Sequence, residues 1–354
     1  MNPISASIIA WYDVNKRDLP WRQTADPYHI WLSEVILQQT RVIQGISYYN
    51  KFVEIFPKVE NLANASEDQV LEHWQGLGYY SRARNLHAAA KHIWQELKGQ
   101  FPKNYDGLIK LKGIGDYTAS AIASFAFHED KAVVDGNVIR VISRLYGIEE
   151  DVRQIKVVQQ IKKNVDALLP LGSSYLFNQS MMELGALVCI PKNPKCDQCP
   201  ILAHCFARKE NLIDKIPFKS KLKAKRIRFF NYLLLQVADE VYLQKRGAGD
   251  IWEGLYDPIL IEENRAYLSS EDFLTHKSLV NNHIKSTRLI QAKKHLLTHQ
   301  ELWVGICLIE LEAKPDNLKG VWVRLDQIQS TPKPIIISKL LTDLSAGQLH
   351  LDFK

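Results

Sequence analysis

The chain has 354 residues, 46% hydrophobic and 24% charged, and at roughly 150 residues per domain this length predicts about two domains. With 17 glycines and 14 prolines it is neither collagen-like nor of low complexity, and no apolar run approaches the roughly 20 residues of a membrane helix. The net charge of +6 permits a polyanionic partner without requiring one.

The first twenty residues lack a basic segment followed by a small-residue cleavage site. We therefore expect a soluble protein that stays in the cytoplasm and has no membrane partner. Five cysteines, an odd number, argue against a disulfide framework in such a chain.

Residues 1 to about 210 predict an almost entirely helical domain. Asp26 and Pro27 are typical of a helix N-cap and first helical position, and Ser66 to Gln69 form a capping box. Apolar residues at helical spacing predict further helices at about 80–97, 116–127, 137–146, 154–169 and 174–188.

Glu34 lies in the first of these helices, inside the apolar stretch WLSEVIL. A buried, unpaired carboxylate is costly, so burial would raise the pKa of Glu34 and suit it to donating a proton at neutral pH. An exposed glutamate on an amphipathic helix is the alternative interpretation.

Two glycines, Gly113 and Gly115, precede the helix predicted to begin at Asp116. Glycines at a helix N-terminus let backbone N–H groups approach an anion such as a DNA phosphate, although a plain helix–helix turn has the same pattern. Asp135 follows an apolar run and precedes a helix, which by itself is most often an N-cap.

Four of the five cysteines cluster with the spacing C-x6-C-x2-C-x5-C, and they are Cys189, Cys196, Cys199 and Cys205. Structural zinc favours two separate C-x2-C pairs, whereas one pair with flanking cysteines is closer to the runs that hold iron–sulfur clusters. Cys307 lies in an alternating apolar stretch and is predicted to be a core residue.

The character of the chain changes after this cluster. Residues 215–228 contain seven basic residues and no acidic one, which predicts an interdomain linker that is either merely solvated or in contact with phosphate. Strand-like runs at about 228–237, 241–246, 301–311 and 320–325, with helical patterns near 270–282 and 335–345, predict an α+β domain. We divide the chain into 1–212, a linker at 213–228, and 229–354.

Several segments resemble the MutY-type adenine DNA glycosylases, members of the helix–hairpin–helix superfamily that also contains endonuclease III. They are LSEVILQQT, QGLGYYSRARNL, LKGIGDYTASAI, VVDGNVIRV and NQSMMELGALVC with the cysteines after it. The resemblance is continuous from about Trp21 to Cys205, and the C-terminal domain matches more loosely. It implies a mainly α fold class, with an all-helical glycosylase domain carrying a [4Fe-4S] cluster on the four cysteines and a C-terminal α+β Nudix-like domain.

The resemblance implies a DNA glycosylase that removes adenine paired with 8-oxoguanine or guanine in double-stranded DNA and so initiates base excision repair. By position, Glu34 is similar to the family's general acid and Asp135 to the carboxylate that stabilises, or transiently bonds, the cationic sugar. Tyr117 stands where endonuclease III has its Schiff-base lysine, which favours a monofunctional glycosylase over the alternative, a glycosylase/AP lyase. In this interpretation Lys112 contacts the DNA backbone and is not a nucleophile.

Further positions resemble the family's site residues. Trp21, Arg22 and Glu183 are similar to its adenine-pocket residues, and Asn137 to a partner of the catalytic carboxylate or of the water. Gln39 and Thr40 are similar to residues that face the orphaned base, Leu77 and Tyr79 to its wedge, and Thr298 and His299 to its lesion-recognition residues. Because the acidic Nudix helix is missing, we expect lesion recognition without pyrophosphohydrolase activity. The resemblance also implies a monomer, associated with the nucleoid if the source is bacterial.

Overall fold

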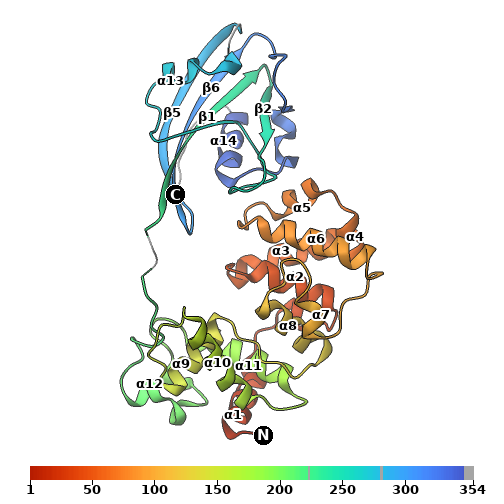
Figure 1. The fold of residues 1–354 in the computed structure, drawn as a ribbon, viewed down its shortest axis with the longest axis vertical. Helices are drawn as coiled ribbons and strands as arrows, with labels where there is room; N and C mark the ends of the chain where they lie inside the picture. The colour runs from red at the N-terminus through yellow and green to blue at the C-terminus, as the bar shows by residue number, and fades with distance from the viewer. Residues whose placement is uncertain (222–223, 280–281, 347–354) are drawn as a thin grey trace. The chain divides into compact units, whose positions relative to one another are not determined.

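A computed structural model describes residues 1–221, 224–279 and 282–346 (Figure 1). Contacts divide the chain into a helical unit, Met1–Asn64 with Asn85–Leu222, and a second unit, Ala65–Arg84 with Lys223–Lys354. The second unit thus includes a segment that the sequence division placed in the first domain. Residues 222–223 of the expected linker lie outside the described residues.

The helical unit is all-helical, as predicted. Its elements are α1 (Pro3–Asn15), η1 (Pro20–Arg22), α2 (Pro27–Leu37), α3 (Val42–Ile55), α4 (Val59–Asn64), most of α6 (Ser81–Gln95), α7 (Tyr105–Leu108), α8 (Asp116–Phe127), α9 (Gly136–Tyr146), α10 (Ile155–Leu168), α11 (Ser174–Leu187), η2 (Cys196–Gln198), η3 (Leu202–His204) and α12 (Phe206–Lys209). No helix in the described ranges is long and apolar enough to cross a membrane.

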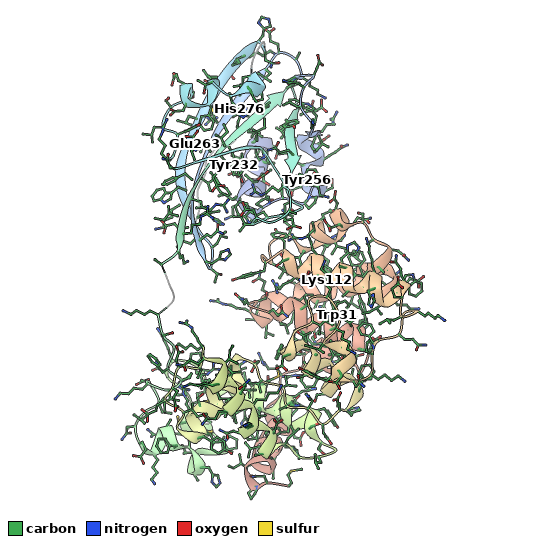
Figure 2. All side chains as sticks on the ribbon, in the orientation of Figure 1. Trp31, Lys112, Tyr232, Tyr256, Glu263 and His276 are labelled. Atoms are coloured by element: carbon green, nitrogen blue, oxygen red, sulfur yellow. The ribbon has the colours of Figure 1, made fainter. Side chains whose placement is uncertain are left out.

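Local sequence signals set several of these helix ends. The Asp26 carboxylate accepts from the Tyr28 backbone N–H at 2.8 Å and caps α2. Helix α2 is buried over most of its length, and Trp31 on it marks the interior of the helical unit (Figure 2). A helix buried nearly all round carries its side chains, Glu34 among them, into the protein interior.

Helices α9 and α11 make a close contact at Gly185. A Cβ at this position would lie 2.6 Å from the Asn137 Cβ and 3.1 Å from the Asn137 backbone carbonyl carbon. Only glycine therefore allows the two helices to approach this closely. The contact fixes the first turn of α9, which carries Asp135 and Asn137.

The second unit is built on a mixed sheet. In the described residues its strands are β1 (Arg226–Val237), β2 (Glu240–Lys245), β3 (Tyr256–Asp257), β4 (Ile259–Glu263), β5 (Ile284–Leu296), β6 (Gln300–Leu311) and β7 (Val321–Arg324). The order is β3-β2-β1-β6-β5, with β4 paired to β1 and β7 to β2; β1 and β6 run parallel and the other pairs antiparallel. The unit also contains α5 (Glu67–Trp74) and α14 (Ile335–Ser345).

The two faces of β1 each contribute to a core. Phe230, Tyr232 and Leu234 pack with the apolar face of α14. Alternate residues, Leu233 and Leu235, pack with Cys307 and Phe273 on the other face, as the period of two in a strand requires. Cys307 is fully buried, as predicted.

Two expectations for the second unit need correction. The helical pattern near 270–282 forms only α13 (Glu271–Leu274) and the 3-10 turn η4 (Lys277–Leu279), and residues 280–281 lie outside the described residues. Strand β5 was not predicted. It stands at the end of the strand order, where lysines and other polar side chains are typical because they protect an exposed edge, and these residues obscure its apolar alternation.

We predict that Gly185→Ala lowers the free energy of unfolding by about 1–3 kcal/mol, because the new methyl group meets the backbone of α9. Gly136→Ala is the matched control: a Cβ there meets nothing within 4 Å, so stability should stay the same or rise by up to about 1 kcal/mol. Urea denaturation followed by circular dichroism measures both. Equal effects would contradict the close approach.

Candidate active site

A cavity of about 820 Å³ lies in the helical unit. Its lining includes many of the side chains singled out from the sequence, namely Trp21, Arg22, Glu34, Gln39, Thr40, Gly113, Gly115, Tyr117, Asp135, Asn137 and Glu183. These residues come from η1, α2, α8, α9 and α11, from the segment between α2 and α3, and from the loops before α8 and α9. Side chains far apart in the sequence thus meet in one space.

Glu34 and Tyr117 form the central pair of this cavity. Glu34 is only 6% exposed, and the Tyr117 hydroxyl donates to its Oε2 at 2.5 Å. Burial raises the pKa of Glu34 to about 7, although the hydrogen bond from Tyr117 partly opposes this. Burial and the neighbouring carboxyl raise the pKa of Tyr117 well above its usual value, so it stays a phenol and a hydrogen-bond donor.

Asp135 is at once an N-cap and a cavity residue. Its Oδ1 accepts from the backbone N–H groups of Asn137 and Val138 at 2.9 and 2.8 Å, and its Oδ2 accepts from the Asn137 side-chain amide at 2.7 Å. Burial raises the pKa of Asp135, and these three donors oppose the rise. Capping orients the carboxylate, and the cavity exposes it to a ligand.

Glu183 is fully buried and holds two guanidinium groups at the cavity wall. Its carboxylate accepts from Arg17 at 2.6 and 2.9 Å and from Arg22 at 2.8 and 3.1 Å. Burial alone would raise the pKa of Glu183, but the hydrogen bonds from Arg17 and Arg22 outweigh it and hold the pKa at about 2. Sequence reasoning did not single out Arg17. Its place in the segment RDLPWR, five residues before Arg22, was the available signal.

The cysteine loop follows α11. All four cysteines are half-buried free thiols. Burial raises the pKa of Cys199 to about 11, and the charges of Cys189, Cys205 and Cys196 contribute in the same direction. In the described part of the chain no three His, Cys, Asp or Glu side chains are spaced to hold a single metal ion. The mutual electrostatic effects of the thiols place the four cysteines near one another.

Arg144 of α9, also missed from the sequence, holds this loop in place. It is buried, and its guanidinium donates to the backbone carbonyls of Ile190 and Ile216 at 2.9 Å and to those of Pro191 and Ile213 at 3.2 Å. An arginine buried among carbonyl groups is satisfied because it has five donors in a fixed plane.

Arg140, one turn earlier on α9, contacts both the cysteine loop and the Asp135 region. It donates to the Cys189 carbonyl at 2.7 Å and to the Asn137 Oδ1 at 2.9 Å. Asn137 in turn donates to Asp135. A continuous set of hydrogen bonds therefore runs from the loop to the cavity carboxylate.

The predicted hairpin lies between α7 and α8. Gly113 has φ +76°, and a Cβ there would lie 2.5 Å from the Asn85 Cβ, so both conformation and space require glycine. Gly115 caps α8 in extended conformation with open space around it. Lys112 is exposed (Figure 2). This arrangement leaves the N-terminal turn of α8 open to a ligand.

A second cavity, of about 340 Å³, lies in the second unit. Leu77, Tyr79, Thr298 and His299 line it, together with the loop 250–252. The hydroxyl groups of Tyr79 and Thr298 are hydrogen-bonded. Tyr79 has φ +48°, an uncommon value for a residue with a side chain. The predicted wedge and lesion-recognition residues therefore meet within this unit.

We predict that Glu34→Gln stabilises the protein increasingly as the pH rises. Folding raises the pKa of Glu34 from 4.5 to about 7, so its contribution to stability is full below pH 4.5 and is lost as the pH rises through 7. Glutamine does not titrate, so by pH 8 the free energy of unfolding of the variant should have risen by on the order of 3 kcal/mol relative to that of wild type. Urea denaturation between pH 5 and 8 measures the difference.

Glu183→Gln is the control for this series. The pKa of Glu183 lies below the tested range, so the variant should be destabilised by a similar amount at each pH, because two half-buried guanidinium groups lose their buried partner. If the difference in the free energy of unfolding between Glu34→Gln and wild type does not change with pH, Glu34 has an ordinary pKa.

The two halves of the chain each resemble known proteins. Residues 32–167 match the HhH-GPD superfamily base excision DNA repair protein, and residues 231–343 match the NUDIX domain. The adenine DNA glycosylase of Buchnera aphidicola subsp. Baizongia pistaciae is 33% identical over 351 residues, which is 97% of each chain. That of Homo sapiens is 44% identical over 211 residues, 57% of this chain and 39% of the human one.

A solved structure, that of a thermostable thymine-DNA glycosylase, covers 58% of this chain and 95% of its own, with a TM-score of 0.54 and 27% identity. Because the Buchnera protein is 33% identical over nearly the full length of both chains, and because residues 32–167 match the HhH-GPD model, this chain belongs to the adenine DNA glycosylase family of the HhH-GPD superfamily.

Proposed function

We propose that the chain is a monofunctional DNA glycosylase that hydrolyses the N-glycosidic bond of adenine paired with 8-oxoguanine or guanine in double-stranded DNA. The observation that carries this proposal is the cavity in which the buried Glu34 carboxyl, hydrogen-bonded by Tyr117, lies together with the Asp135 carboxylate. Two carboxyl groups in different environments supply the acid and the anion that cleavage of a glycosidic bond requires.

Glu34 acts as the general acid. With a pKa of about 7, a large fraction of its carboxyl groups carry a proton at neutral pH, and this proton passes to a ring nitrogen of adenine as the bond to C1′ lengthens. Neutral adenine leaves far more readily than its anion. The hydroxyl of Tyr117 holds Oε2 of Glu34 in place, so the other carboxyl oxygen of Glu34 is left to contact adenine.

Asp135 stabilises the sugar cation that remains. Its carboxylate is fixed by three donors, so it needs little reorganisation when positive charge develops at C1′. Water then adds to C1′ and its proton passes to the Glu34 carboxylate, which has given its own proton to adenine, so that hydrolysis is complete. Because the phenol of Tyr117 cannot form an imine, the product is an abasic site in an unbroken strand.

The cavity is large enough for a base that has left the helix. Trp21 supplies an aromatic wall, and the Arg22 guanidinium, held by Glu183, supplies hydrogen-bond donors beside it. We assign Gln39 and Thr40 to the side of the orphaned base. Unpairing costs least at a mismatch, which favours adenine in an A:8-oxoguanine or A:G pair.

Binding to DNA uses both units. The amides at Gly113 and Gly115 contact a phosphate independently of sequence, and Leu77 and Tyr79 form the wedge that fills the space left by adenine. In the second unit the Thr298 hydroxyl reads the lesion. We therefore assign catalysis to residues 1–212 and recognition of the opposite base to 229–354.

The four cysteines fit a [4Fe-4S] cluster better than a zinc ion because their spacing has one C-x2-C pair with a flanking cysteine on each side, not two separate pairs. Cys189, Cys196, Cys199 and Cys205 would hold it, and the group would crosslink the loop that Arg144 and Arg140 attach to α9. Backbone N–H groups of Ile201 and Arg208 donate to Cys199 and Cys205 and so favour their thiolate forms.

The proposal is tested with a duplex that contains one adenine opposite 8-oxoguanine. We expect breaks at the adenine only after alkali, because hydrolysis leaves an abasic site. Glu34→Gln should lower the single-turnover rate by at least about a hundredfold, the usual contribution of a general acid, and still bind the duplex. Efficient breaks without alkali would favour the endonuclease III-type alternative, and no abasic site would refute the proposal.

The cluster is tested separately. We expect purified protein to contain iron and acid-labile sulfide in near equal amounts, about four of each per chain. Cys199→Ser should reduce both, because it removes one ligand, whereas Cys307→Ser lies outside the loop and serves as the control. Zinc without sulfide would contradict the assignment.

A further inference from the structure

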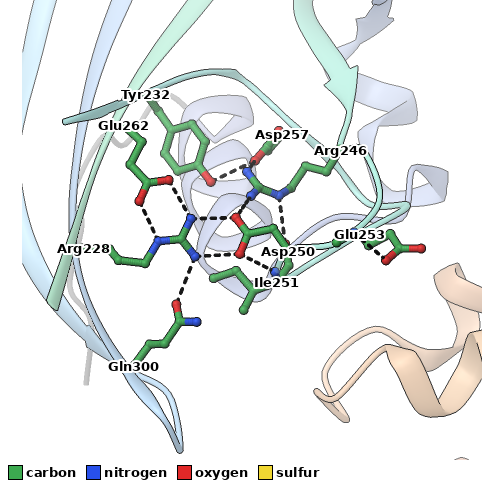
Figure 3. Close-up of polar contacts among 10 residues, drawn as sticks. Arg228, Tyr232, Arg246, Asp250, Ile251, Glu253, Asp257, Glu262 and Gln300 are labelled. Atoms are coloured by element: carbon green, nitrogen blue, oxygen red, sulfur yellow. Dashed lines mark hydrogen bonds and ion pairs between the residues drawn. The ribbon is translucent and has the colours of Figure 1, made fainter. Parts of the chain in front are cut away.

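Arg228 lies near the start of β1, is only 6% exposed, and uses all five of its N–H donors (Figure 3). Its guanidinium donates to both oxygens of Glu262 at 2.7 and 2.6 Å and to both oxygens of Asp250 at 2.6 Å. The fifth donor bonds the Gln300 Oε1 at 3.1 Å. Such a set requires the planar, forked shape of arginine.

The three acceptors belong to three different segments. Asp250 lies in the loop after β2, Glu262 on β4, and Gln300 is the first residue of β6. Gln300 follows His299 directly, and its carbonyl accepts from the Leu297 backbone N–H at 2.9 Å, which closes the turn that carries Thr298 and His299. Arg228 therefore connects the loop at 250 to this turn.

A second arginine extends the network. Arg246 donates to Asp250 at 3.0 Å and to Asp257 at 2.9 Å, and the Tyr232 hydroxyl donates to Asp257 at 2.9 Å (Figure 3). Asp250 is thus held by two guanidinium groups. Both arginine side chains are nearly buried, whereas the Asp250 and Glu262 side chains are 37% and 32% exposed, so these ion pairs lie at the edge of the protein interior.

The segments that Arg228 joins are two walls of the 340 Å³ cavity. Asp250, Ile251 and Trp252 line one side, and residues 295–299 line another. Trp252 has φ +62°, and its ring centroid lies 6.2 Å from that of His295. The ring contact joins the loop at 250–252 to residues 295–299. Arg228 bonds both segments, through Asp250 and Gln300.

We propose that Arg228, through Asp250 and Gln300, is a positioning residue that places the Thr298–His299 turn for recognition of the base opposite adenine. This inference rests on the proposed function of that turn. Arg228 does not itself contact DNA in this proposal. It determines how well the protein distinguishes 8-oxoguanine from guanine, because a displaced Thr298 hydroxyl can no longer reach the group by which the two bases differ.

The test compares the affinities of full-length variants for two duplexes, with 8-oxoguanine or guanine opposite a tetrahydrofuran abasic analogue, by fluorescence anisotropy. Because the abasic analogue carries no adenine, this assay measures recognition of the opposite base without base release. In Arg228→Lys, the three N–H donors of an ammonium cannot replace the five planar donors of the guanidinium. Gln300→Ala removes only the link to the turn and keeps both ion pairs, so it is the milder variant. Arg265→Lys, in an exposed pair with Asp272 of the same unit, is the matched control.

We expect the ratio of the affinity for the 8-oxoguanine duplex to that for the guanine duplex to fall roughly tenfold in Arg228→Lys and several-fold in Gln300→Ala. Losses of this size correspond to one misplaced hydrogen bond. In Arg265→Lys the ratio should stay at the wild-type level. A wild-type ratio in folded Gln300→Ala, or equal losses on both duplexes in Arg228→Lys, would overturn the proposal. Failure of wild-type protein to release adenine would refute the proposed function alone, because the affinity ratio needs no catalysis.

Discussion

The chemistry of the site depends on the burial of one carboxyl group. Helix α2 is buried over most of its length, so Glu34 loses water, and the hydrogen bond from Tyr117 is the main interaction that partly restores its acidity. Burial alone would leave the group too weak an acid, and exposure would leave it ionised. The balance between the two places its pKa near neutrality, where a proton can be both held and given.

Tyr117 can make this contribution because α8 begins at Asp116 and its first turn faces α2. The hairpin glycines that start α8 are therefore part of the site as well as of the expected contact with DNA. Asp135 is positioned by the same principle, as the cap of α9. In both places a helix N-terminus fixes a side chain to which we assign a role in the proposed reaction.

Buried arginines organise the regions that have little regular structure of their own. Arg144 holds the cysteine loop by backbone carbonyls, and Arg228 holds a loop and a turn by side-chain oxygens. Each joins segments that lie far apart in the sequence. An arginine serves this purpose because its donors are planar and always charged, and its removal takes one hydrogen-bond partner from several acceptors at once.

The sequence by itself determined the helices of the first half, because apolar periodicity and capping residues are local signals, as at Asp26 and in α8 and α9. It also determined which residues to examine, since Glu34, Tyr117, Asp135 and the cysteines stand in short motifs with definite spacing.

Only the tertiary structure decided what those residues touch. The pairing of Glu183 with Arg17, the edge strand β5, the grouping of Ala65–Arg84 with the second unit, and the five contacts of Arg228 all depend on segments distant in sequence. No local pattern encodes such contacts, because the free energy of a buried charge depends on the groups that folding brings around it.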